Sequence, residues 1–173
     1  MHGEEAMKYG TAGRMWLGAL AVLAMTAGAC DDKATTVESP GADACEHFAS
    51  GPIRAITAGA DAATAADASA EHTRWDVTLA AVGGAGHGFL AIEIDAAGDH
   101  TFFFDRAVTL TMRDGNGATV APEASATSDA DCAEVGGAFT FELAVGTYSL
   151  ELSSSSTDLL GLVWFGAGEE HEH

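Results

Sequence analysis

The alternation of apolar and polar residues in the second half of the chain constrains its fold more than any other feature. Between residues 74 and 152, large apolar residues recur at every second position in separate short runs. This period of two is typical of strands that bury one face and expose the other. The runs are Trp75–Val77–Leu79, Leu90–Ile92–Ile94, Phe102–Phe104, Val108–Leu110–Met112, Phe139–Phe141–Leu143 and Tyr148–Leu150–Leu152.

Two further segments complete the predicted set of strands. Pro52–Ala58 is a candidate first strand, and Leu159–Phe165 is a nearly continuous apolar run that suits a strand buried on both faces. Short strands at close spacing, with turn residues between them, favour two packed antiparallel sheets. The sequence therefore predicts an all-β antiparallel sandwich of about eight strands over residues 45–166. A closed β-barrel is the alternative.

Some segments fall outside this pattern. The alanine-rich run Ala58–Ala70 has no large apolar residue, so we expect a surface loop with at most one helical turn. Gly83–Gly88 is predicted to be a glycine-rich loop. Phe89 and Phe103 lie off the predicted core faces, and a contiguous exposed patch there would mark an interaction surface.

The segment Phe141–Leu152 (FELAVGTYSLEL) combines an aliphatic strand, a Gly-Thr-Tyr turn and a second strand. It resembles the terminal hairpin of bacterial prepeptidase-type accessory β-sandwich domains, and residues 88–165 as a whole are weakly similar to such domains. The resemblance implies a sandwich fold and a non-catalytic role.

The N-terminal region has the composition of a secretory leader. Met15–Ala29 is apolar apart from Thr26, and it is too short for the ~20 residues that a membrane-spanning helix needs. Small residues at its end suit signal-peptide cleavage, so we predict a signal peptide over residues 1–29. Translation from Met7 would give the leader a basic start without acidic residues.

The run Thr26–Cys30 (TAGAC) resembles a bacterial lipoprotein signal, in which small residues precede the lipidated cysteine, although Ala27 stands where that family usually has leucine. The resemblance over residues 7–30 implies lipid on Cys30 and an extracytoplasmic protein anchored in the cell envelope. Cleavage by the ordinary signal peptidase at Ala27-Gly28-Ala29 would instead give a secreted or periplasmic protein. Residues 30–44 have no apolar periodicity and are predicted to be an acidic flexible tether.

The chain has three cysteines, an odd number for an exported protein. If Cys30 carries lipid, Cys45 and Cys132 are left to form a disulfide in an oxidising compartment. The alternative is a Cys30–Cys45 bridge, with Cys132 as a buried thiol.

Charge and motifs exclude several functions. After residue 29 the chain carries five Lys and Arg against 24 Asp and Glu, because the leader holds two of each. This balance argues against binding nucleic acid or an anionic membrane surface, and it attracts cations. The sequence also contains no recognisable nucleophile, zinc-protease or phosphate-loop motif, so we expect no enzyme.

Histidines are the most informative candidate ligands. Four of them follow a glutamate, and the acidic tail 167–173 ends in Glu-Glu-His-Glu-His. Imidazole beside carboxylate suits Zn or Cu. The predicted metal ligands are His47, His72, His171 and His173. His87 is expected at the surface, and His100 as a structural ring at the start of a strand.

Two functions follow from the sequence. The first is an envelope-tethered, non-catalytic module that binds a protein or glycan partner. The second is an envelope protein that handles Zn or Cu through its histidines.

Overall fold

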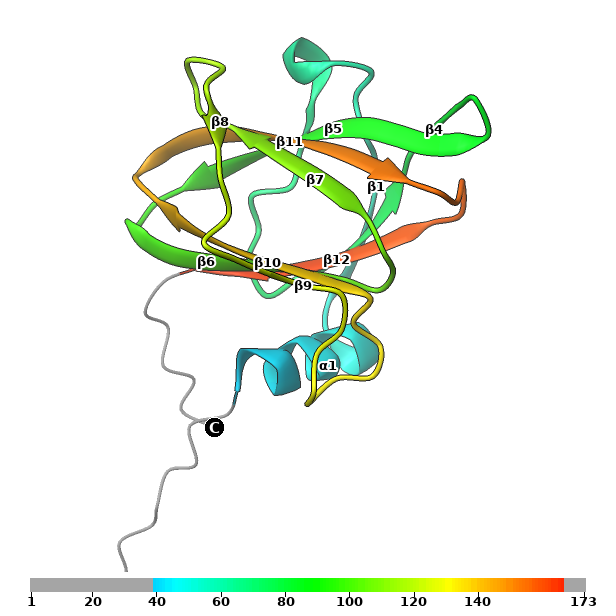
Figure 1. Cartoon of the computed structure of the whole chain (residues 1–173), viewed down its shortest axis with the longest axis vertical. Helices are drawn as coiled ribbons and strands as arrows, with labels where there is room; N and C mark the ends of the chain where they lie inside the picture. The colour runs from blue at the N-terminus through cyan, green and yellow to red at the C-terminus, as the bar shows by residue number, and fades with distance from the viewer. Residues whose placement is uncertain (1–38, 167–173) are drawn as a thin grey trace, which may run out of the picture. The chain divides into compact units, whose positions relative to one another are not determined.

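The computed structural model describes residues 39–166, which form two β-sheets and one α-helix (Figure 1). The first sheet has the order β1 (Ile53–Thr57), β3 (Arg74–Thr78), β12 (Leu160–Phe165), β6 (Gly98–Phe104), β10 (Gly137–Leu143) and β9 (Ala124–Ala126). The second has the order β2 (Ala66–Asp67), β5 (Ala85–Ile94), β11 (Gly146–Ser154), β7 (Thr109–Arg113) and β8 (Thr119–Val120), with β4 (Ala80–Val82) also paired to β5. No helix within residues 39–166 is long and apolar enough to cross a membrane.

The predicted all-β sandwich is confirmed, and neither sheet closes into a barrel. Most strand pairs are antiparallel, as expected. Two are parallel: β1 pairs with β3, and β2 pairs with β5. Both involve short edge strands from the first third of the domain, where the sequence alternation is weakest.

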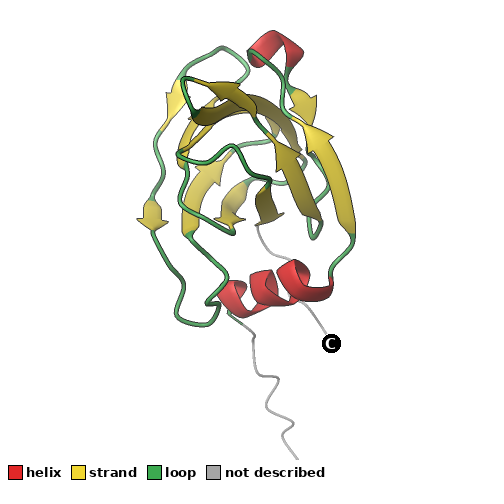
Figure 2. Cartoon of the chain, turned by 90° about the vertical axis from the view of Figure 1, so that its right-hand side faces the viewer, coloured by secondary structure: helices red, strands yellow, loops and turns green. Residues whose placement is uncertain are grey.

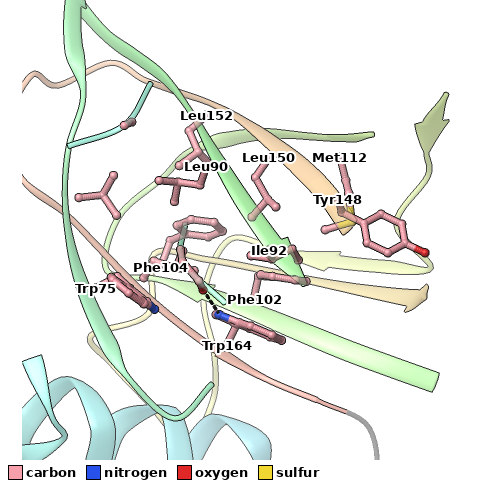
Figure 3. Close-up of a cluster of buried hydrophobic side chains, with 14 of the residues drawn as sticks. Trp75, Leu90, Ile92, Phe102, Phe104, Met112, Tyr148, Leu150, Leu152 and Trp164 are labelled. Atoms are coloured by element: carbon pink, nitrogen blue, oxygen red, sulfur yellow. Dashed lines mark hydrogen bonds between the residues drawn. The ribbon is translucent and has the colours of Figure 1, made fainter. Parts of the chain in front are cut away.

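The main core lies between the two sheets and contains the residues that the alternation selects (Figure 3). Trp164 is fully buried, and its ring stacks on Phe102 with the ring centroids 5.6 Å apart. Its indole Nε1 donates a hydrogen bond of 2.9 Å to the carbonyl oxygen of Ala68, so the one polar atom of this side chain is satisfied inside the core. His100 is also buried, with its ring 6.2 Å from that of Trp164, and has the structural position expected for it.

Strand β12 is buried on both faces, as its continuous apolar sequence predicts. One face enters the main core through Leu160, Leu162 and Trp164. The opposite face contributes Val163 and Phe165 to a second apolar cluster, which lies on the outside of the first sheet beneath α1 (Pro40–Ser50). Figures 1 and 2 show this helix lying against one side of the sandwich. Phe103 belongs to the same cluster and is only 3% exposed, so the expected exposed patch at Phe103 is wrong.

Local signals explain where α1 begins and ends. The Ser39 side chain accepts a hydrogen bond from the Ala42 amide, Pro40 occupies the first turn, and Gly51 follows the last turn. The helix buries Ala44 and Phe48 in the second cluster. Residues 40–44, predicted to be part of the tether, are therefore helical and partly buried, because a sheet face far along the chain provides their packing surface.

The disulfide between Cys45 and Cys132 is present, with a Cα–Cα distance of 5.3 Å. It links α1 to the connection between β9 and β10, across 87 residues of sequence. This is the predicted pairing, and the alternative Cys30–Cys45 bridge is wrong. Disulfides of this kind are typical of oxidising compartments.

Two predicted loops have partly regular structure. Ala58–Ala70 contains the single 3₁₀ turn η1 (Ala62–Thr64) and the short strand β2. In the glycine-rich segment, Gly83 and Gly84 adopt positive φ and form the turn between β4 and β5, and the following residues belong to β5. His87 is therefore a strand residue, paired with Glu151 through an Nε2–Oε1 distance of 3.2 Å.

Candidate metal centre

Helix α1 presents two candidate ligands on one flank. Asp43 and His47 are four residues apart, the spacing that places two side chains next to each other on a helix. The Oδ1 of Asp43 lies 3.4 Å from the Nε2 of His47, and the two side chains are only 9% and 19% exposed. On its other edge, the His47 ring lies against Gly51, where an added Cβ would be 2.8 Å from Nδ1.

The third residue, His72, comes from the connection before β3. Its backbone amide donates a 3.2 Å hydrogen bond to the carbonyl oxygen of Trp164, which attaches this connection to β12. His72 has a φ of +50°, and it is the one non-glycine residue of the described chain with positive φ. Positive φ is uncommon for residues with a Cβ, although histidine adopts it more often than most, and such conformations gather at functional sites.

Phe165 provides the apolar wall of the cluster. Its ring centroid lies 5.6 Å from that of His47 and 4.8 Å from that of His72, and the two imidazole centroids are 5.4 Å apart. The Nδ1 atoms of both histidines are buried. The three rings therefore form one packed group between α1, β12 and the connection before β3.

One donor atom from each of Asp43, His47 and His72 lies within 4.8 Å of the other two. Donors at 2.0–2.2 Å from a tetrahedral zinc ion are about 3.3–3.6 Å apart. The Asp43–His47 distance of 3.4 Å already matches one edge of such a tetrahedron. Shortening the other donor distances, which are at most 4.8 Å, to this length would complete a three-ligand set of imidazole and carboxylate, which is suited to Zn or Cu.

The structure brings together two of the four predicted metal ligands, His47 and His72. It adds Asp43, which lies in the predicted tether and is not among the predicted ligands. The signal that could have found Asp43 is its four-residue spacing from His47 after a Ser-Pro helix start. His171, His173 and the predicted lipidation site Cys30 lie outside the described residues. His87 and His100 belong to other parts of the sandwich.

Comparisons with known proteins give no family for this chain. No protein-family model matches it, and no curated protein matches its sequence.

Proposed function

We propose that this chain is an extracytoplasmic metal-binding module, held in the cell envelope by lipid on Cys30. The observation that carries the proposal is the convergence of Asp43, His47 and His72 within 4.8 Å. This is the second of the two functions predicted from the sequence, an envelope protein that handles Zn or Cu. A protein or glycan partner stays a prediction.

Three features support a metal ion as the ligand. The donor types are those preferred by Zn and Cu, and the Asp43–His47 distance matches one edge of a tetrahedral shell. The strained backbone of His72 has a reason if its ring must reach the ion. The negative charge of the chain also raises the local concentration of cations.

The sequence contains no recognisable nucleophile, zinc-protease or phosphate-loop motif, so the proposed role is non-catalytic. Three protein ligands leave one tetrahedral position open. His171 or His173 of the C-terminal tail could fill that position, as the sequence analysis predicted. A water molecule is the other candidate.

Calorimetric titration of the full chain with Zn(II) and Cu(II) tests the proposal. We expect binding at micromolar or lower concentration, with one ion per chain. A free metal concentration of about 100 times the dissociation constant would then stabilise the fold by about 2.7 kcal/mol in thermal unfolding. Affinity should fall as the pH is lowered, because protons compete for the imidazole nitrogens.

The decisive variant is His72→Asn, because asparagine tolerates left-handed backbone and removes the imidazole. It should keep the fold and weaken binding at least about tenfold, by analogy with the loss produced when a group supporting a metal ligand is removed. His87→Gln is the matched control, since it removes a histidine from the second sheet. A His171→Gln/His173→Gln variant measures the contribution of the tail. Absence of binding in the wild type, or equal affinity in His72→Asn, would overturn the proposal.

A further inference from the structure

Helix α1 is linked to the sandwich on two opposite flanks. Successive residues of an α-helix are rotated by about 100°, so Asp43 and His47 share one flank and Cys45 lies about 200° from Asp43. Ala44 and Phe48 occupy the face between the flanks and pack on the first sheet. The disulfide thus holds one side of the helix, and the candidate metal ligands lie on the other.

The two links join α1 to different parts of the fold. Cys45 is bonded to Cys132 in the β9–β10 connection. Asp43 and His47 face His72, which is attached to β12 through its backbone amide. A metal ion bound by these three residues would therefore be a second crosslink of α1 that does not involve the disulfide.

The position of α1 depends on these links because the helix is short. It has 11 residues, and isolated helices below about 12–15 residues are marginal in water. Apart from the disulfide, Ala44 and Phe48 are its buried apolar anchors, and the Nη1 of Arg74 donates a 2.6 Å hydrogen bond to the Phe48 carbonyl oxygen near its C-terminal end. The disulfide secures the helix at Cys45, which lies midway in the sequence between Asp43 and His47.

We infer that the Cys45–Cys132 disulfide and the metal site are thermodynamically coupled through α1. This inference rests on the proposed function. Loss of the disulfide increases the fraction of molecules in which Asp43 and His47 have moved away from His72, and the apparent affinity falls in proportion to the competent fraction. Because coupling between two sites is reciprocal, the bound ion must equally stabilise the disulfide against reduction.

The coupling makes the site sensitive to redox conditions. A dithiol reductant attacks one sulfur of the bridge, which releases the other cysteine as a thiol and leaves a mixed disulfide. The second thiol of the reductant then displaces the cysteine held in that mixed disulfide. The S–S bond is replaced by two thiols, and the reductant leaves as a disulfide after giving up two electrons and two protons. Cys45 is half-buried and Cys132 is 1% exposed, so Cys45 is the sulfur that a reductant reaches.

The first test compares Zn(II) affinity of the full chain in the wild type and in Cys45→Ala/Cys132→Ala, under non-reducing conditions. Alanine removes the thiols, which would otherwise bind zinc themselves. We expect an affinity loss of about 5- to 150-fold, the usual range of coupling between sites. Ile92→Ala is the matched control, because it destabilises the main core and leaves the disulfide intact. Its affinity should equal that of the wild type when circular dichroism shows both proteins folded.

The second test uses the wild type alone, so it does not depend on folding of the alanine variant. A phosphine reduces the disulfide with or without saturating Zn(II), and thiol labelling follows the reaction. At a Zn(II) concentration that saturates the wild type but not His72→Asn, zinc should slow reduction in the wild type and leave the rate in His72→Asn almost unchanged. The inference alone is overturned if the wild type binds zinc and removal of the disulfide does not change the affinity. It is also overturned if zinc binds but does not slow reduction of the disulfide. No zinc binding by the oxidised wild type overturns the proposed function itself.

Discussion

Replacement of Phe103 by alanine tests whether α1 covers the outer face of the first sheet. Phe103 points away from the main core, yet it is only 3% exposed, because it packs in the cluster beneath the helix. Removing a buried phenylalanine costs about 3–5 kcal/mol. Total stabilities of about 5–15 kcal/mol are normal for a domain, so the variant should remain folded while losing a large part of its stability.

Phe89→Ala is the matched control. Phe89 also lies on the outer face of a sheet, but it is half-buried and its main aromatic neighbour is the ring of His87, 5.2 Å away. Half of the transfer free energy of a fully buried side chain is about 0.8–1.5 kcal/mol, which is the expected cost. Urea denaturation followed by tryptophan fluorescence measures both variants, since Trp75 and Trp164 are buried in the folded state.

Equal losses of unfolding free energy in Phe103→Ala and Phe89→Ala would refute the conclusion that α1 covers the outer face of the first sheet. A second difference is expected in metal binding. The Phe103 ring lies 5.8 Å from that of Phe165, which packs against both imidazoles. Phe103→Ala should therefore weaken Zn(II) binding, whereas Phe89→Ala should not.

Two further expectations concern the second sheet and its turns. Hydrogen bonds from the side chain and backbone of Ser69 hold the pKa of Asp67 below 3.8. The stabilisation that ionised Asp67 contributes is therefore present above the unfolded-state pKa, and it is lost as the pH falls through the lower folded-state pKa. Carbon-detected NMR titration should give an Asp67 midpoint that rises in Ser69→Ala, and an unchanged midpoint would contradict this cause. Tyr148→Phe removes a hydroxyl that accepts from the Ala144 amide and donates to its carbonyl oxygen, so urea denaturation should show a loss of about 1–2 kcal/mol. An unchanged unfolding free energy would contradict that bridge.

The strands could be predicted because each carries its evidence locally. The alternation at Leu90–Ile94 or Tyr148–Leu152 identifies the buried face without knowledge of the partner strand, and all of these predicted inward residues belong to the main core. Which strands pair, and whether a pair is parallel or antiparallel, are not local properties of the sequence. The parallel pairing of β1 with β3 brings Ile53 opposite Arg74, and no residue of either strand encodes that direction.

Helix α1 could not be predicted from apolar periodicity because its packing surface is distant in sequence. Its two buried apolar anchors, Ala44 and Phe48, meet Phe103 and Val163, which lie more than 50 residues further along the chain. The Ser39-Pro40 start and Gly51 end were visible in the sequence, but a pair of anchors in 11 residues does not by itself indicate a stable helix. The same distant packing explains why Phe103 looked exposed.

The candidate metal centre likewise has one part that the local sequence indicates and one part that depends on the fold. Residue chemistry selected His47 and His72, because imidazole next to carboxylate is a local feature. Asp43 enters the site through the phase of α1, and His72 reaches it through a left-handed backbone that glycine or asparagine would adopt at lower cost. The histidine held in that conformation lies against Phe165 and opposite a helical Asp–His pair. Metal coordination supplies a reason for the imidazole of His72 at this position. The disulfide on the far flank of α1 keeps Asp43 and His47 within reach of His72.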